Sequence, residues 1–131
     1  MVKNRQHQLV NTPEADVEAD TLTELDREFV RSINDIVEKN IANSDFSIVD
    51  ITSELGVSRS LLHTKMKSLM DISMGEVIRK KRLEKACELL KKGYNVSESA
   101  YRTGFSDPNY FSKAFKKQMG VSPSEYVEAT R

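Results

Sequence analysis

The sequence predicts an all-α chain that contains two copies of one helix-turn-helix unit. Apolar residues recur at helical spacing from Thr23 to Met119, and no stretch alternates apolar and polar residues as a half-buried strand would. Ile48–Ser58 also aligns with Val96–Ser106. Each aligned segment predicts a short helix and a glycine turn, and ends at a serine that can start a second helix, which is the outline of a helix-turn-helix.

The length and composition fit one globular domain, or two very small ones that share a core. The chain has 131 residues, of which 38% are hydrophobic and 31% are charged. Its single cysteine, Cys87, cannot form an internal disulfide, which favours a reducing compartment. No apolar run approaches the ~20 residues that span a bilayer, and the first residues lack the apolar core of a secretory signal. We therefore expect a cytoplasmic protein with no membrane contact in this segment.

The net charge of zero conceals two parts of opposite charge. Residues 1–45 carry 5 Lys and Arg against 10 Asp and Glu, whereas residues 46–131 carry 15 against 10. The first part is acidic, and residues 1–22 lack an apolar period, so we expect residues 1–22 to be a linker or tail. The basic surplus belongs to the folded part of the chain, residues 23–131, and is compatible with a polyanionic partner.

The first predicted helix runs from Leu25 to Asn40. Its expected buried face repeats every four residues, and Thr23 with Asp26 resembles a capping box at its start. The residues expected on the buried face are Leu25, Phe29, Ile33 and Val37.

The first helix-turn-helix is predicted at about residues 47–70. Ser47 and Ser58 are suited to cap its two helices, and Gly56 supplies the positive φ that ends the first of them. The residues expected inside are Ile48, Ile51 and Leu55 in the first helix and Leu61, Leu62, Met66 and Leu69 in the second.

A long connecting helix is predicted at about residues 74–92, with Gly93 ending it. The second helix-turn-helix follows at about residues 95–119, with Asn95 and Ser106 as the caps of its two helices. The residues expected on the buried face of the connecting helix are Ile78, Leu83, Ala86, Leu89 and Leu90. Cys87 is expected to be a buried or half-buried small hydrophobic residue.

The second helix of each unit has a polar, basic face opposite its apolar face. On the helix from Asp107 to Met119, the apolar arc holds Phe111, Ala114, Phe115 and Met119, with Tyr110 at its edge. Short polar side chains can reach base edges in the major groove, and lysines can neutralise phosphates. The residues on the opposite arcs are Ser60, His63, Thr64 and Lys67 in the first unit and Asn109, Ser112, Lys113, Lys116 and Lys117 in the second.

Periodicity alone leaves other functions open, because lysine-rich exposed faces are commonly just solvated. A helical protein-interaction module would also fit the helix pairs, and its binding would depend little on salt. An enzyme finds no support, since the sequence has no phosphate-binding glycine loop, HExxH or GxSxG. We expect no catalytic residue, cofactor or metal site.

The stretch GFSDPNYFSKAFKKQMGVSPSEY closely resembles the signature of the second helix-turn-helix of the arabinose-operon regulator (AraC/XylS) family, and the resemblance covers about Phe46 to Val127. It implies an all-α DNA-binding domain of about seven helices, in which two helix-turn-helix subdomains are joined by the long helix. That helix would be roughly 25–30 Å long, which suits two recognition helices in successive major-groove segments. The matching residues are Ala100, Gly104, Phe105, Ser106, Tyr110, Phe111, Phe115, Lys116, Gly120, Pro123 and Tyr126.

The resemblance also implies roles for exposed residues of both recognition helices. Where the family often has an arginine reader this chain has Thr64, so we expect the first helix to read fewer bases. The expected base-reading residues are Ser60, His63, Thr64, Asn109, Ser112 and Lys113. The expected phosphate contacts are Ser58, Lys67, Ser106, Lys116 and Lys117.

The expected partners are double-stranded DNA and RNA polymerase, because most of the resembling family activates transcription. The family usually couples this domain to a sensing domain. The first 45 residues, which carry a net negative charge, are too few to form such a domain. Either the chain is a fragment that follows a sensor or receiver domain, as in the output domain of a hybrid two-component sensor, or it is a short, self-sufficient regulator. An unpatterned acidic lead-in favours the fragment.

Overall fold

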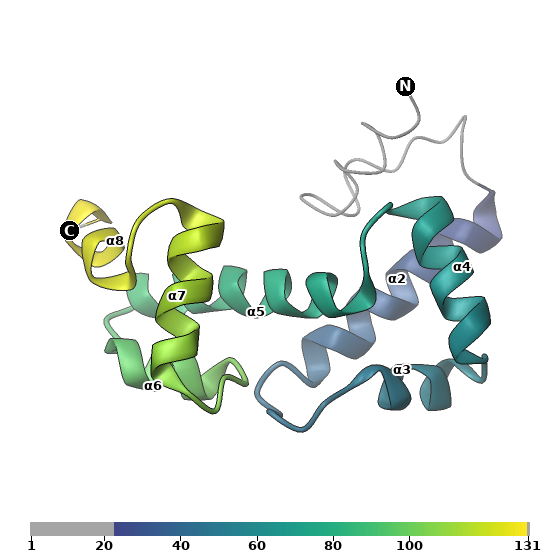
Figure 1. Cartoon of the computed structure of the whole chain (residues 1–131), viewed down its shortest axis with the longest axis horizontal. Helices are drawn as coiled ribbons and strands as arrows, with labels where there is room; N and C mark the ends of the chain where they lie inside the picture. Colours follow the sequence, from purple (N-terminus) through teal and green to yellow (C-terminus); the bar gives the residue numbers. More distant parts are fainter. Residues whose placement is uncertain (1–22, 131) are drawn as a thin grey trace. The chain divides into compact units, whose positions relative to one another are not determined.

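The computed structural model describes residues 23–130, and within this range it contains seven α-helices and no strand. This confirms the all-α fold class; the acidic segment expected to be a linker or tail lies outside the described residues. The helices, labelled in Figure 1, are α2 (Glu24–Lys39), α3 (Ile48–Leu55), α4 (Arg59–Leu69), α5 (Met74–Lys91), α6 (Val96–Arg102), α7 (Pro108–Met119) and α8 (Pro123–Thr130). None of them combines the length and apolar composition needed to cross a membrane.

The described chain divides into two compact units. Unit 1 comprises residues 23–38 and 47–77, and unit 2 comprises residues 39–46 and 78–130. The first helix-turn-helix, α3 and α4, lies in unit 1, and the second, α6 and α7, lies in unit 2. Helix α5 begins in unit 1 and continues through unit 2, so it is the connecting helix that the sequence predicts.

Helix α2 contributes a buried stripe to unit 1, but the stripe begins later than its apolar period suggests. Thr23 Oγ1 accepts a hydrogen bond from the Asp26 amide at 3.0 Å, as expected of a capping residue. Ile33 and Val37 are fully buried, whereas Leu25 is 76% exposed, so its predicted burial is wrong. The apolar period continues one turn beyond the surface against which α2 packs, because periodicity marks a side of a helix and not the extent of its contact.

Helices α3 and α4 are bounded by the predicted caps. The Asp50 carboxylate accepts from the Ser47 amide at 2.9 Å, and Gly56 closes α3 with a φ of +70°. Leu61 on α4 was expected in the core but is 45% exposed. The reason is that the contact surface of α4 is narrower than its apolar arc and is filled by Leu62, Met66 and Leu69, which are buried.

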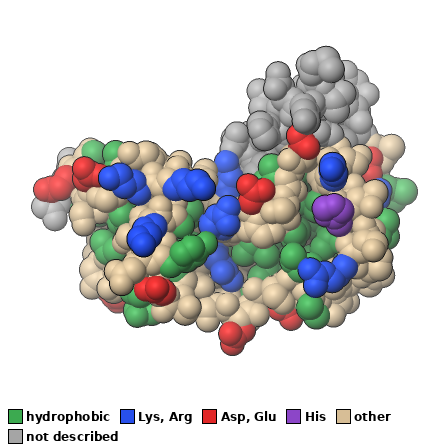
Figure 2. Space-filling view, in the orientation of Figure 1, with side chains coloured by type: hydrophobic (Ala, Val, Ile, Leu, Met, Phe, Trp, Pro, Cys, Tyr) green, Lys and Arg blue, Asp and Glu red, His purple; other side chains and the backbone are tan. Residues whose placement is uncertain are grey.

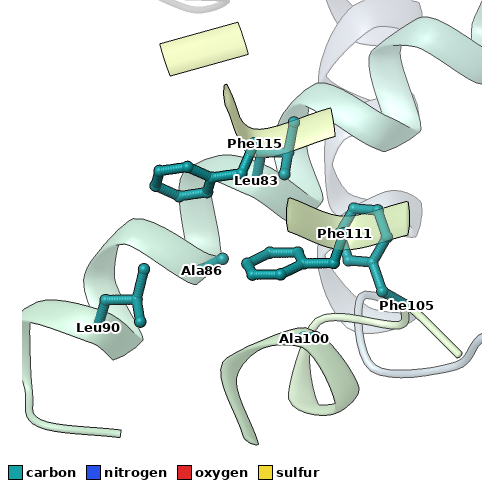
Figure 3. Packing of buried hydrophobic residues seen from close by; sticks show 7 residues of the cluster. All are labelled: Leu83, Ala86, Leu90, Ala100, Phe105, Phe111 and Phe115. Carbon is teal, nitrogen blue, oxygen red and sulfur yellow. The ribbon is translucent and has the colours of Figure 1, made fainter. Parts of the chain in front are cut away.

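Unit 2 is built around an aromatic core. Figure 3 shows the rings of Phe105, Phe111 and Phe115 beside the aliphatic side chains of α5. The ring centroids of Phe105 and Phe111 are 5.1 Å apart, and those of Phe111 and Phe115 are 5.7 Å apart. These spacings are typical of packed aromatic pairs. The cluster consists of Leu83, Ala86, Leu90, Ala100, Phe105, Phe111 and Phe115.

The cap of α7 differs from the prediction. Asp107, and not Ser106, is the N-cap, and its side chain accepts from the Asn109 amide at 2.9 Å. Pro108 then occupies the first helical position, where its missing N–H and its fixed φ cost nothing. The helix therefore begins one residue later than a serine cap at position 106 would place it.

Cys87 on α5 is half-buried, as expected. Burial raises the pKa of its thiol, and a hydrogen bond with Tyr126 opposes this effect. Because a thiol with a raised pKa is a weaker nucleophile at neutral pH, the thiol behaves as a small core side chain.

Candidate nucleic-acid interface

Helix α4 presents a polar face on the side away from the core of unit 1. Leu62 and Met66 hold the helix against the core, each with 2% of its surface exposed. With about 100° between successive residues, the predicted reading and anchoring side chains project from the other side. Those side chains, all exposed in the structure, are Ser60, His63, Thr64 and Lys67.

The N-terminus of α4 is suited to an anion. The Ser58 side chain accepts from the Leu61 amide at 3.0 Å, so Ser58 is the N-cap, and it is exposed. The first turn of α4 contains no acidic residue. Backbone amides and the positive end of the helix dipole therefore meet no competing carboxylate within that turn.

Arg59 is a further cation of this face that the sequence analysis did not single out. It is exposed and precedes His63 and Lys67 by four and eight positions, so the three side chains follow one side of α4. The four-residue spacing from His63 and Lys67 was sufficient to predict that Arg59 lies on this face. These three residues also border a hollow of about 370 Å³ beside α4, whose lining includes the apolar side chains of Leu62 and Met66.

Lys65 takes a structural part instead. Its Nζ lies 3.2 Å from Asp26 Oδ1 on α2 and 5.9 Å from the centre of the Phe29 ring. The hydrogen bond from Lys65 lowers the pKa of the Asp26 carboxyl, aided by a bond from the Thr23 side chain and opposed by partial burial. This contact joins α4 to α2 within unit 1.

Helix α7 presents the corresponding face in unit 2. Phe111 and Phe115 are fully buried, while Asn109 and Lys113 on the other side are exposed. Lys116 and Lys117 are also exposed, and Ser112 is half-buried. The helix holds three lysines and no acidic residue, and Figure 2 shows Lys and Arg side chains gathered over it. Such a surface attracts phosphate.

The N-terminus of α7 differs from that of α4 in its chemistry. Pro108 has no amide hydrogen, and the Asn109 amide is already bonded to the Asp107 carboxylate. Ser106 is exposed but is not the cap, so its phosphate contact stays a prediction that would have to come from its own hydroxyl. Phosphate binding at this end of α7 would therefore depend more on side chains than it does at α4.

Within residues 23–130, no group of three or more His, Cys, Asp and Glu side chains is arranged to hold a metal ion. The polar residues that α4 and α7 each expose instead carry hydroxyl, amide, imidazole and cationic groups. These groups can donate hydrogen bonds to base edges and neutralise phosphates, which is the chemistry of a DNA-binding surface.

Comparison with known proteins agrees with the helix-turn-helix outline of these helices. A family model described as a helix-turn-helix domain matches residues 51–129, which include all of α4 to α7. The C-terminal domain of AraT, a response regulator from Geobacillus stearothermophilus, has 34% sequence identity and a TM-score of 0.72. That similarity covers 83% of this chain and 88% of the solved domain.

Two curated relatives extend the comparison. A histidine kinase of Formosa agariphila is 37% identical over 107 residues, which is 81% of this chain and 8% of the kinase. A TCP pilus virulence regulatory protein of Vibrio cholerae is 31% identical over 103 residues, which is 78% of this chain and 37% of that regulator. The chain thus spans a minor part of the length of these relatives.

Proposed function

We propose, because this chain belongs to the AraC-type helix-turn-helix family, that its two units read two segments of one double-stranded DNA site. The function of this family is sequence-specific DNA binding for the regulation of transcription. The observation that carries the proposal is the duplicated arrangement of α4 and α7. Each follows a short helix and a turn, and each exposes polar and basic residues opposite buried apolar ones. Two such faces on one chain fit two successive segments of the major groove.

In this proposal the shorter polar side chains read bases. The side-chain amide of Asn109 has the donor and acceptor pair that matches adenine, and the Lys113 side chain can donate to guanine. Ser112 is half-buried and can reach only a base edge that comes close to α7. On α4 the proposed base-reading residues are Ser60, His63 and Thr64. They offer hydroxyls and an imidazole, but none of them has the paired donors of an arginine guanidinium.

The lysines on the same faces hold the DNA backbone. Lys67 on α4 and Lys116 and Lys117 on α7 are exposed cations that neutralise phosphates without reading sequence. Ser58 adds the anion-binding N-terminus of α4, and Arg59 is a further cation beside it. Unit 1 thereby has enough anchoring groups to hold DNA even where α4 discriminates few bases.

We further propose that the chain is an output domain. A histidine kinase and a response regulator are among the proteins to which it is similar, and the acidic lead-in fits a linker that follows a receiver or sensor. Activation through contact with RNA polymerase is the proposed outcome, since the relatives include transcription regulators and most members of the resembling family activate. The cytoplasm is the proposed location, because it fits a DNA partner.

Selection of bound duplexes from a random DNA pool, at two salt concentrations, tests the function. The expected result is one asymmetric motif whose two segments lie about one helical turn apart, with retention that falls as salt rises. Enrichment of a single segment would mean that α4 holds the backbone without reading it. Weak retention that is insensitive to salt, with no motif, would contradict DNA binding and favour a protein-docking module.

A further inference from the structure

The first turn of α7 has fewer free backbone donors than a helix N-terminus that usually holds phosphate. Pro108 has no N–H, the Asn109 amide is bonded to Asp107, and the Asp107 carboxylate itself carries a negative charge. An uncharged or cationic side chain at this end of α7 would therefore add a phosphate contact that the backbone supplies only in part.

Tyr110 is the side chain with the right position and chemistry. It lies in the first turn of α7, next to Asn109 and three positions before Lys113, and it is 52% exposed. A tyrosine that is half outside the core presents its hydroxyl to the solvent while its ring still packs on one side. Within residues 23–130 the Tyr110 hydroxyl has no hydrogen-bond partner.

The Tyr110 ring packs against a ring of the aromatic core. Its centroid lies 6.0 Å from that of Phe105, with the two planes at 45°. Phe105 is itself 5% exposed and packs against the Phe111 ring in the aromatic cluster. A ring supported in this way loses little conformational freedom when its hydroxyl forms a bond, so the contact is preorganised.

We propose that Tyr110 anchors α7 to the DNA backbone by donating its phenolic hydroxyl to one phosphate oxygen at the edge of the groove that α7 reads. The inference deepens the proposed function and rests on it. Tyr110 sets the depth and register of α7, while Asn109 and Lys113 beside it reach the bases. Tyrosine is a suitable donor here because its phenol is uncharged. A cationic side chain at this position would instead form an ion pair with the nearby Asp107 carboxylate.

A neutral anchor has a signature that distinguishes it from the lysines. The salt dependence of DNA affinity counts the phosphates neutralised by cations, and a phenol neutralises none. Loss of the Tyr110 hydroxyl should therefore lower affinity about tenfold, as expected for a lost hydrogen bond to a charged group, with the slope of affinity against salt unchanged. Loss of Lys116 should reduce that slope by about one.

The test uses the Tyr110→Phe variant, which keeps the ring and removes only the hydroxyl. Its matched control is Tyr101→Phe on α6, because Tyr101 is 55% exposed and belongs to the same helix-turn-helix. Affinities are measured by fluorescence anisotropy on the selected DNA site across a salt series, and urea unfolding checks that both variants are folded. We expect a tenfold loss with an unchanged slope for Tyr110→Phe, and no change for Tyr101→Phe.

A second measurement locates the phosphate. Duplexes in which single phosphates are replaced by uncharged methylphosphonates should weaken wild-type binding at several positions, and at one of them Tyr110→Phe should show no further loss. Unchanged affinity of Tyr110→Phe overturns the inference, as does a loss that no single phosphate accounts for. Failure of the wild-type chain to bind any DNA specifically would instead overturn the proposed function, so the two failures are distinguishable.

Discussion

The guanidinium of Arg82 on α5 donates a hydrogen bond from Nη2 to the main-chain carbonyl of Asn43, at 2.8 Å. Asn43 belongs to the segment that connects α2 to α3, so this bond holds that segment within unit 2. Gly104 lies against the same place: a Cβ built on it would be 2.5 Å from the Ile41 carbonyl oxygen and 2.8 Å from Arg82 Nε. The connecting segment, α5 and the turn before α7 therefore meet where no side chain larger than hydrogen fits.

Gly104→Ala should destabilise the protein by about 2–4 kcal/mol. The residue has a φ of +87°, which disfavours an L side chain, and the added methyl would also clash with backbone. Gly120→Ala is the matched control, because its φ is +85° but nothing lies within 4 Å of its Cβ position. It should cost only about 1–2 kcal/mol, and equal urea midpoints for the two variants would contradict the clash.

Phe115→Ala should cost about 3–5 kcal/mol of unfolding free energy, because it empties the aromatic core of unit 2. The Phe115 ring is fully buried and lies 5.7 Å from Phe111 and 5.5 Å from Tyr126, centroid to centroid. Urea denaturation followed by circular dichroism measures the loss. A variant with unchanged stability would mean that the inward face of α7 is assigned wrongly.

Asn34→Leu should stabilise the protein by about 1–2 kcal/mol. Asn34 on α2 is 4% exposed, and neither its amide nitrogen nor its amide oxygen has a hydrogen-bond partner within the described residues. An unsatisfied buried amide costs free energy that an apolar side chain of similar size does not. DNA affinity, measured alongside, should stay unchanged. A lower denaturant midpoint would show instead that an ordered water satisfies the amide.

Asp26→Asn should lower stability at pH 7 by up to about 1 kcal/mol, since it removes a partly exposed ion pair with Lys65. The folded state lowers the Asp26 pKa, mainly through the hydrogen bond from Lys65. The contribution is therefore complete above the unfolded pKa of about 3.9 and is lost as the pH falls through the lower folded value.

The measurement for Asp26→Asn is urea unfolding at pH values from 7 downward. The difference from the wild type should begin to shrink only below about pH 4. Asp35→Asn on the exposed side of α2 serves as the control and should change stability little at any pH. A difference between Asp26→Asn and the wild type that stayed constant in acid would argue against the pair.

Asn109→Ala and Lys116→Ala should separate sequence reading from backbone anchoring. Asn109→Ala should cost about 1–3 kcal/mol on the selected site and relax the preference at one or two base pairs. Lys116→Ala should weaken binding to every duplex and lower the salt slope by about one. Binding to the selected site and to random DNA, each titrated at several salt concentrations, checks both. Equal effects of the two changes on both DNAs would remove the distinction between reader and anchor.

Most of the local structure could be predicted from the sequence. Asn95 caps α6 by accepting from the Glu98 amide at 2.8 Å, and Gly93 has the expected positive φ after α5. Caps and glycines act within one turn of the chain, so their chemistry is legible without tertiary contacts. The cap that was wrongly predicted at Ser106 also depends on local sequence. Proline is favoured at the first helical position, so Pro108 by itself predicts Asp107 as the N-cap.

The sequence by itself determined the class of the fold, most of the helix ends and the polar sides of α4 and α7, because these follow from periodicity and from groups a few residues apart. The tertiary structure decided how far each apolar face is covered, which leaves Leu25 and Leu61 outside. It also decided the partners of Lys65 and Arg82, each 39 positions away in the chain. Such contacts depend on how helices pack, and no local pattern specifies which distant residue a long cationic side chain will meet.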